Sequence, residues 1–275
     1  MGFFEFFKSK NNKTFNEHHF QNINDDIVKI DENGELRYVP NGAVKHGVFV
    51  VPKQVVTIGP FAFNHLNDLN KVVLHKDIEF IAPGAFEDCK NLKEIVGLED
   101  CVKLRDLSGF YGCKSLKHVD VPENLGVFGE YAFCGCESLE SVDVPLGCWG
   151  IGELAFCGCK SLQEIHLPPS MSIIGSQAFK DCDNLTIYLD TDQNYYGEIN
   201  MCIDGENYSI PSGNILIKPG ALGDAREVIV KDNDTLKKVI NSGYDGIVSL
   251  NYPEHNSVVS INIHEMDEQM GNNYM

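Results

Sequence analysis

Apolar and polar positions follow a fixed repeat along the middle of this 275-residue chain. Phenylalanine returns at intervals of 23, 24, 23, 23 and 23 residues, at Phe63, Phe86, Phe110, Phe133, Phe156 and Phe179. Each lies in the phrase Ile-Gly-x-x-Ala-Phe-x-x-Cys-x-x-Leu-x-x-Ile-x-Leu-Pro, and residues 151–168 are its most complete copy. A period of this length is typical of small stacked units that bury their apolar faces only against one another. The pattern therefore predicts a solenoid, and it directs attention to extended surfaces rather than to catalytic pockets.

Each repeat contains two segments with the pattern of a short strand. The first reads Leu-x-x-apolar-x-apolar, as in Leu162–Leu167, and this alternation indicates one buried face. Proline follows at Pro122, Pro145 and Pro168, and because proline has no N–H to donate to a ladder, we expect strand pairing to stop there. The second segment is an apolar pair before glycine, as in residues 173–175, and predicts another strand ended by a glycine turn. The Ala-Phe-x-x-Cys-x-x-Leu stretch has the spacing of a tight helical or 3₁₀ turn.

Equivalent residues of stacked coils lie one strand spacing apart, about 4.8 Å, so we expect separate buried columns of phenylalanine, leucine and cysteine. The phrase resembles the repeat of the BspA-like (treponemal-type) leucine-rich repeat family, in which proline follows the strand and Gly-x-x-Ala-Phe-x-x-Cys marks the far side of the coil. The resemblance covers about residues 45–190. It implies an α/β leucine-rich-repeat solenoid that is mostly β, a right-handed stack of short parallel strands with 3₁₀ or helical turns and irregular caps. Two copies depart from the phrase: Ser108–Cys113 lacks the Ile-Gly entry, and Leu66 stands where the other copies have cysteine.

The flanks of the repeat predict caps, because an open end of a solenoid exposes apolar core and unpaired strand edges. We divide the chain into residues 1–44 as an N-terminal segment and cap, 45–190 as repeats of about 23 residues, and 191–275 as degenerate repeats, a C-terminal cap and a tail. A separate small domain is the alternative for the last part. Local patterns predict a hairpin from Ile27–Ile30 and Leu36–Pro40, a helix at Asp234–Gly243, strands at Val228–Val230, Ile247–Leu250 and Val258–Ile263, and a solvated tail at Glu265–Met275.

The charge of the chain limits the class of partner. The net charge is −18, and the sequence contains no dense cluster of Lys and Arg. Nucleic acids and anionic membranes are therefore unexpected partners, and a neutral or basic protein or peptide is favoured. No run of 18 apolar residues predicts a membrane span. The segment Met1–Lys8 is too short and is interrupted by Glu5, so we expect a docking segment rather than a signal-peptide core, and a cytoplasmic location with export by a non-standard route as the alternative.

Ten cysteines raise the question of disulfides or metal. The repeat accounts for five of them, since cysteine packs as a small buried hydrophobe, and we expect reduced thiols. The pairs Cys134-x-Cys136 and Cys157-x-Cys159 fall in adjacent coils, where four thiolates can form a tetrahedral zinc site. A redox or disulfide role is a second interpretation and plain packing a third. Packing is favoured because the spacing is C-x-C rather than C-x₂₋₄-C, so no metal and no cofactor is expected.

The candidate partner-binding face consists of the polar strand residues that flank the buried apolar positions. Stacked acids at strand spacing repel one another, which a basic partner would relieve. A cation site at Asp120, Asp143 and His166 and a merely solvated sheet face are the alternatives. No motif for a catalytic Ser/His/Asp set or a phosphate-binding glycine loop is present. The residues of this face are Lys71, Glu94, His118, Asp120, Ser141, Asp143, Glu164 and His166.

These observations favour a non-enzymatic protein–protein interaction scaffold, because repeat surfaces commonly bind partners along their length. A cell-surface adhesin or secreted effector, exported without an ordinary signal peptide, is the first alternative. A metal-binding protein that uses the cysteine cluster is the second.

Overall fold

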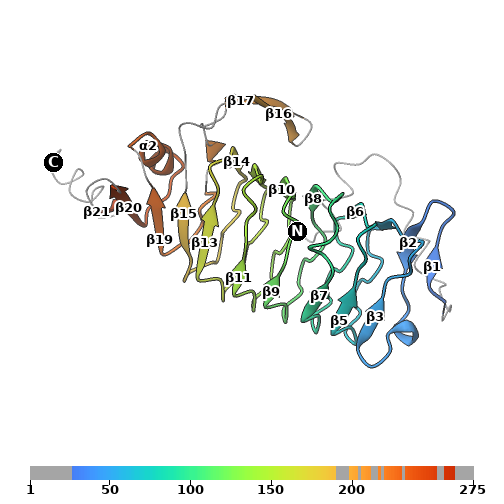
Figure 1. Ribbon diagram of the computed structural model, residues 1–275. Helices are drawn as coiled ribbons and strands as arrows, with labels where there is room; N and C mark the ends of the chain where they lie inside the picture. The colour runs from blue at the N-terminus through green and yellow to red at the C-terminus, as the bar shows by residue number, and fades with distance from the viewer. Residues whose placement is uncertain are drawn as a thin grey trace.

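The computed structural model describes residues 27–189, 198–203, 206–211, 216–217, 220–230, 233–252 and 257–263. The predicted docking segment Met1–Lys8 and the predicted tail Glu265–Met275 lie outside these residues. The described chain is an elongated, mostly β solenoid in which parallel strands from successive coils form two rows (Figure 1). None of its described helices has the length and apolar character needed to cross a membrane.

The first row forms the open strand face. Its strands are parallel, and equivalent residues are paired from coil to coil, as Val72 is with Ile95 and Ile165 with Ile187. An antiparallel strand, β21 (Ser257–Asn262), closes this row beside β20. The parallel strands are β3 (Val48–Val50), β5 (Lys71–Val73), β7 (Glu94–Val96), β9 (His118–Val119), β11 (Ser141–Val142), β13 (Glu164–Leu167), β15 (Thr186–Leu189), β19 (Glu227–Val230) and β20 (Ile247–Tyr252).

The second row consists of two-residue strands on the other side of each coil. They are also parallel, and the hairpin of β1 (Lys29–Ile30) and β2 (Glu35–Tyr38) closes the row at its N-terminal end, where β2 pairs with the first of them. The predicted N-terminal hairpin is thus confirmed. The row comprises β4 (Thr57–Ile58), β6 (Phe80–Ile81), β8 (Asp106–Leu107), β10 (Val127–Phe128), β12 (Gly150–Ile151), β14 (Ile173–Ile174) and β18 (Leu216–Ile217).

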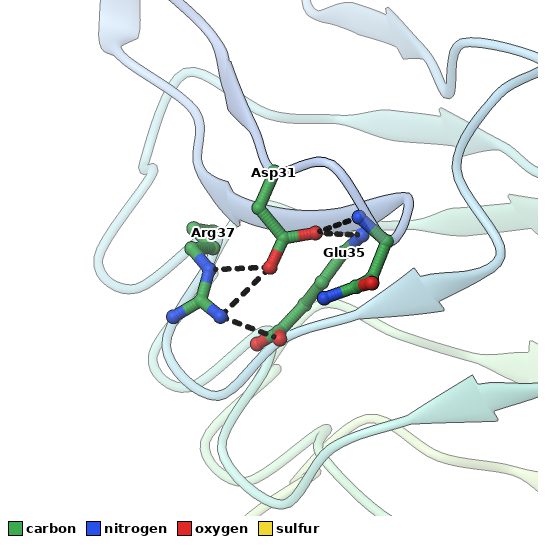
Figure 2. Close-up of polar contacts among 4 residues, drawn as sticks. Asp31, Glu35 and Arg37 are labelled. Carbon is green, nitrogen blue, oxygen red and sulfur yellow. Dashed lines mark hydrogen bonds and ion pairs between the residues drawn. The ribbon is translucent and has the colours of Figure 1, made fainter.

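The hairpin turn is held by one carboxylate. Asp31 Oδ1 accepts hydrogen bonds from the backbone N–H groups of Asn33 and Glu35, each at 2.9 Å. Its other oxygen accepts from the Arg37 guanidinium at 3.0 and 2.8 Å, and Arg37 also reaches Glu35 at 3.1 Å (Figure 2). The Glu35 N–H bond and then the Arg37 bond lower the pKa of Asp31.

The six phenylalanines form one buried column, as the repeat predicts. Each is fully buried, and successive ring centroids lie 4.5, 5.0, 5.5, 5.7 and 5.6 Å apart with nearly parallel planes. Offset-stacked aromatic rings attract beyond their buried area, so the column links neighbouring coils along the solenoid.

The repeat cysteines form a second buried column that hydrogen-bonds to the first. Each thiol donates to the carbonyl oxygen of the phenylalanine in the preceding coil, for example Cys159 Sγ to Phe133 O at 3.3 Å. The same phenylalanine carbonyl accepts the N–H of the cysteine in its own coil, as Phe133 does from Cys136 at 3.0 Å. A thiol therefore serves this position better than a methyl group, because it fills the space and also donates. The other pairs are Cys89 with Phe63, Cys113 with Phe86, Cys136 with Phe110, and Cys182 with Phe156.

The tight turn expected after each phenylalanine is present as successive i→i+3 hydrogen-bonded turns. In the regular coil, Cys159 N–H donates to Phe156 O and Leu162 N–H donates to Cys159 O, both at 3.1 Å. Gly158 between them has φ of +74°, which interrupts a helical run. Within the described residues, the one 3₁₀ helix is η2 (Asn41–Ala43) before the first coil.

The glycine of the Ile-Gly entry begins the turn after the strand and also permits close packing of the coils. Gly152 and Gly175 have ordinary backbone angles, but a Cβ at Gly152 would lie 2.6 Å from the backbone nitrogen of Glu130. At Gly175 the corresponding distance to Glu153 N is 2.5 Å. The expected turn is present, because Ala155 N–H donates to Gly152 O at 3.4 Å, and in addition each such glycine lets its coil approach the backbone of the preceding one.

The 24-residue interval before Phe110 comes from one irregular coil. The chain advances 12 residues from Ile95, the central residue of β7, to Leu107 at the end of β8. The equivalent step in the next coil, from Val119 at the end of β9 to Phe128 at the end of β10, is 9 residues. From Leu107 to Phe110 the chain advances 3 residues, against 5 from Phe128 to Phe133. Ser108 takes the entry position of this shortened turn, and its hydroxyl donates to Asp106 at 3.1 Å. Burial raises the pKa of Asp106.

Beyond β15 the stacking resumes after an insertion. Phe179 N–H donates to Ala221 O at 3.1 Å, as Phe156 N–H donates to Ala178 O at 2.9 Å, so Leu222 takes the phenylalanine position of the next coil. The insertion contains the antiparallel hairpin of β16 (Glu198–Ile203) and β17 (Glu206–Pro211), which stands beyond the two rows in Figure 1. Helix α2 (Asn233–Asn241) then precedes β20, so the predicted helix and the three predicted C-terminal strands are present.

Candidate functional site

All eight residues of the predicted face lie on the first row of strands or directly after them. They occupy two lines of side chains that run along the solenoid. We call the first line the leading row, which holds the first residue of each strand from β5 to β15: Lys71, Glu94, His118, Ser141, Glu164 and Thr186. We call the second line the trailing row, which holds the position two residues after the first residue of each strand from β3 to β15: Val50, Val73, Val96, Asp120, Asp143, His166 and Tyr188.

The leading row begins with an ion pair. Lys71 Nζ lies 2.5 Å from Glu94 Oε2, and the two residues are paired in register on β5 and β7. Both side chains are exposed to solvent, where such a pair contributes about 0–1 kcal/mol. Glu94 is thus neutralised by its neighbour, and it does not belong to a repelling stack of acids.

His118 joins the two rows in the middle of the face. Its Nδ1 lies 2.9 Å from Ser141 Oγ, and its Nε2 lies 2.9 Å from Asp120 Oδ1. The side chains of His118 and Asp120 are 47% and 61% exposed. A hydrolytic triad also needs preorganised oxyanion donors and exclusion of water, and this chain of hydrogen bonds is exposed to solvent.

The N-terminal end of the trailing row is apolar, which the predicted face does not include. Val50, Val73 and Val96 are paired in register on β3, β5 and β7. Val50 is 64% and Val96 39% exposed, so this end presents methyl groups to solvent at strand spacing. The prediction considered polar residues only. The signal was present in the sequence, since these valines stand where Asp120 and Asp143 stand in later repeats.

The C-terminal end of the trailing row is aromatic. His166 and Tyr188 are paired in register on β13 and β15, and their rings stack with centroids 4.1 Å apart. Tyr188 was missed because the repeat fades near it. Its position, two residues after Thr186 in the strand, is the only sequence signal for it.

Two carboxylates of the face stand without a partner. Within the described part of the chain, neither Asp143 nor Glu164 has a hydrogen bond or ion pair. Asp120 is held by His118, so the expected repulsion between stacked acids is reduced to these two. No group of three or more His, Cys, Asp or Glu side chains in the described residues could hold a metal ion, so the cation site at Asp120, Asp143 and His166 is not supported.

The four-cysteine cluster is divided by the backbone. Cys136 and Cys159 belong to the buried column, whereas Cys134 and Cys157 are only partly buried on the outside of the coil. The two inner thiols donate to phenylalanine carbonyls, whereas the outer Cys157 thiol lies 4.0 Å from Asp181 Oδ2. A tetrahedral site needs all four sulfurs around one point, which this arrangement does not provide.

Known proteins resemble the chain over its repeats. The family model described as BspA type leucine rich repeat region matches in six copies, over residues 41–149 and 128–225. A leucine-rich repeat protein from Bacteroides ovatus ATCC 8483 is 25% identical with a TM-score of 0.51, and the match covers 72% of this chain and 54% of that one.

Two further solved structures match more loosely. A leucine rich cell surface protein from Faecalibacterium prausnitzii A2-165 is 25% identical with a TM-score of 0.48, over 66% of this chain and 54% of that one. The T. pallidum leucine-rich repeat protein is 22% identical with a TM-score of 0.41, over 80% and 94%. The chain spans about half the length of the first two structures. No curated protein matches the sequence.

Proposed function

The chain belongs to the BspA-type leucine-rich repeat family, whose model matches more than half of it, and from this membership we propose that it is a non-enzymatic scaffold for protein–protein interaction. Proteins of this repeat class generally bind other proteins, and the family and fold are typically non-enzymatic. The proposed binding site is the open strand face, and the trailing row is its centre.

One observation carries the proposal: the trailing row changes character along its length. It begins with three valines, continues with Asp120 and Asp143, and ends with the His166–Tyr188 stack. A contiguous stripe of exposed apolar side chains marks an interaction site. The exposed valines in register therefore favour a face that binds a partner over one that is only solvated. Apolar ends provide buried contact area, and the acids between them provide orientation.

The row also indicates the chemistry of the partner. Asp143 lacks a counter-charge among the described residues, and the whole chain carries a net charge of −18. A basic group that approaches Asp143 would therefore be attracted at long range and at contact. The partner segment we propose carries apolar side chains that cover Val73 and Val96, followed by a Lys or Arg beside Asp143.

The test starts with capture from native lysate and continues with affinities for the purified partner. Asp143→Lys should weaken binding about tenfold or more, and the loss should shrink as salt rises. The double variant Val73→Thr/Val96→Thr keeps β-branched side chains but removes apolar area, and it should weaken binding with little dependence on salt. The matched control is Asp68→Lys/Asp183→Lys, which changes exposed acids in the turns and should bind like wild type.

The binding site would lie on another surface if the Asp143 and valine variants bound the partner as tightly as wild type while the turn variant bound it more weakly. Circular dichroism of each variant separates lost binding from lost folding.

A further inference from the structure

Cys134 and Cys157 occupy a position for which the repeat sets no residue type. They directly follow Phe133 and Phe156, and the equivalent residues of the other coils are Asn64, Glu87, Tyr111 and Lys180. These side chains share no size, charge or polarity, so core packing does not require cysteine here. The position contrasts with the buried column, where cysteine recurs in five coils.

The two thiols face each other across adjacent coils. Equivalent positions in stacked coils lie about 4.8 Å apart, within the Cα–Cα range of about 4.4–6.8 Å that a disulfide spans. The backbones are joined at this point, because Gly135 N–H donates to Cys157 O at 2.7 Å. Cys134 and Cys157 lie close enough to shift each other's pKa, and both are only partly buried.

We propose that Cys134 and Cys157 form a surface dithiol site that is oxidised to an intramolecular disulfide by small-molecule disulfides. The site is separate from the open strand face and is independent of the proposed binding function. Its groups come from neighbouring coils: Asp181 Oδ2 lies 4.0 Å from Cys157 Sγ, and Tyr111, Tyr131 and Lys180 are close enough to act electrostatically.

The surroundings assign different roles to the two sulfurs. The side-chain interaction with Cys134 lowers the pKa of Cys157, against the effects of burial and of the nearby Asp181 and with a smaller contribution from Lys180. The same interaction, followed by burial, raises the pKa of Cys134, which keeps its proton longer. Cys157 is therefore the attacking thiolate and Cys134 the resolving thiol.

The reaction balances in two exchanges. The Cys157 thiolate attacks one sulfur of the small disulfide, forms a mixed disulfide and releases one small thiolate. Cys134 then gives up its proton, which the released thiolate or water takes, and attacks the Cys157 sulfur. The Cys134–Cys157 bond forms and the second small thiolate leaves, so the two protein thiols are oxidised and the disulfide is reduced to two thiols.

The experiment treats the folded, full-length chain with 5,5′-dithiobis(2-nitrobenzoate), an aromatic disulfide whose released thiolate is coloured. In wild type, Cys134 and Cys157 together should release two coloured thiolates in a fast phase and retain no adduct. The mass of the protein should fall by two hydrogens, and peptide mapping should locate the new bond between Cys134 and Cys157. The buried column should react only after denaturant is added, because its thiols are inaccessible and burial raises their pKa values.

Serine variants separate a dithiol from two independent thiols. Cys134→Ser should release one fast thiolate and retain one adduct on Cys157, because no resolving thiol is present. In Cys157→Ser the rate of the fast phase should fall at least tenfold, because the attacking thiolate is absent and the remaining Cys134 keeps its proton. Two retained adducts on wild type, or a fast phase that survives in Cys157→Ser, would overturn the proposal. Mapping of wild type decides the question even if a serine variant fails to fold.

Discussion

The imidazole of His166 lies flat on the ring of Tyr188, with ring centroids 4.1 Å apart and planes that differ by 2°. The two residues come from adjacent coils, yet their side chains are in direct contact on the outside of the sheet. Side chains one strand spacing apart can thus form a continuous layer. The trailing row is for this reason one surface with apolar ends and an acidic centre, and a partner would contact several coils at once.

Removal of one ring from the buried column should be costly. Phe156 lies between Phe133 and Phe179 at 5.7 and 5.6 Å and is fully buried. Phe156→Ala should lower the free energy of unfolding by about 3–5 kcal/mol, measured by urea denaturation. Phe80 is 42% exposed on the second row, so Phe80→Ala should cost less than about 1 kcal/mol. Similar losses in the two variants would contradict the assignment of the column.

A methyl group at the entry glycine should disrupt the contact between two coils. In Gly152→Ala the new Cβ would meet the backbone of Gly129 and Glu130 at 2.6–2.7 Å, and backbone cannot move aside as a flexible side chain can. We expect a loss of about 2–4 kcal/mol in the free energy of unfolding. Gly147→Ala is the control, because nothing lies within 4 Å of its added Cβ, and it should change stability by less than about 1 kcal/mol. An unaffected Gly152→Ala protein would show that the coils are not this close.

Substitution by glycine should stabilise the fold at position 177 and destabilise it at position 163. Gln177 is exposed and has φ of +55°, a conformation that costs an L-residue about 1–2 kcal/mol. Gln177→Gly should therefore raise the free energy of unfolding by about 0.5 kcal/mol after the greater entropy loss of glycine. Gln163 is equally exposed but has no positive φ, and Gln163→Gly should lower it by about 0.5–1 kcal/mol. Chemical denaturation of the pair tests for opposite signs.

Glu87 should make stability depend on pH. Burial, and secondly the nearby Asp88, raise its pKa from 4.5 to about 7, and one of its carboxyl oxygens is buried without a hydrogen-bond partner. Between these two pKa values the folded chain binds more protons than the unfolded chain, so this carboxyl destabilises the fold as pH rises from about 4.5 to about 7.

Glu87→Gln removes that titration. The variant should match wild type within about 0.5 kcal/mol near pH 4.5 and exceed it by about 1 kcal/mol at pH 8, a figure reduced from the full shift because the side chain is partly exposed. Unfolding midpoints measured across this range provide the check. Two parallel stability–pH profiles would show that Glu87 is not the group responsible.

The repeat made most of the fold predictable, because a residue that recurs every 23 positions must meet its own copies in a stack. The phenylalanine column, the strand order and the terminal hairpin followed from that rule and from local turn chemistry. The packing role of Gly152 could not be predicted. Glycine is needed both where two backbones approach closely and where a residue has a positive φ, and the sequence alone does not distinguish the two cases. The division of the cysteines followed from the repeat, which indicated that Cys136 and Cys159 point inward, and the structure shows both buried.

The candidate face was only partly predictable. The charged positions were identified because they interrupt apolar alternation, and the structure brings them to one side. Their pairing was not predictable, since Lys71 with Glu94 and His118 with Ser141 depend on side-chain conformations that period alone does not fix. Val73 and Val96 flank the buried positions in the sequence as the polar residues do, but the candidate face was restricted to polar side chains.

The hydrogen bonds of the phenylalanine peptide groups also determine when each coil can be completed during synthesis of the chain. The carbonyls of the first five phenylalanines accept the thiol of the following coil. Each phenylalanine N–H donates to a carbonyl of that coil, which belongs to Gly109 for Phe86 and to an alanine for the other five. A ribosome releases coils from the N-terminus, so each newly emerged coil carries a buried N–H that no earlier residue can satisfy. Every growing chain therefore ends in an incomplete layer until the next coil arrives. Ala221 supplies the acceptor for Phe179 across the insertion, so the last phenylalanine layer is completed only when the nascent chain has passed this residue.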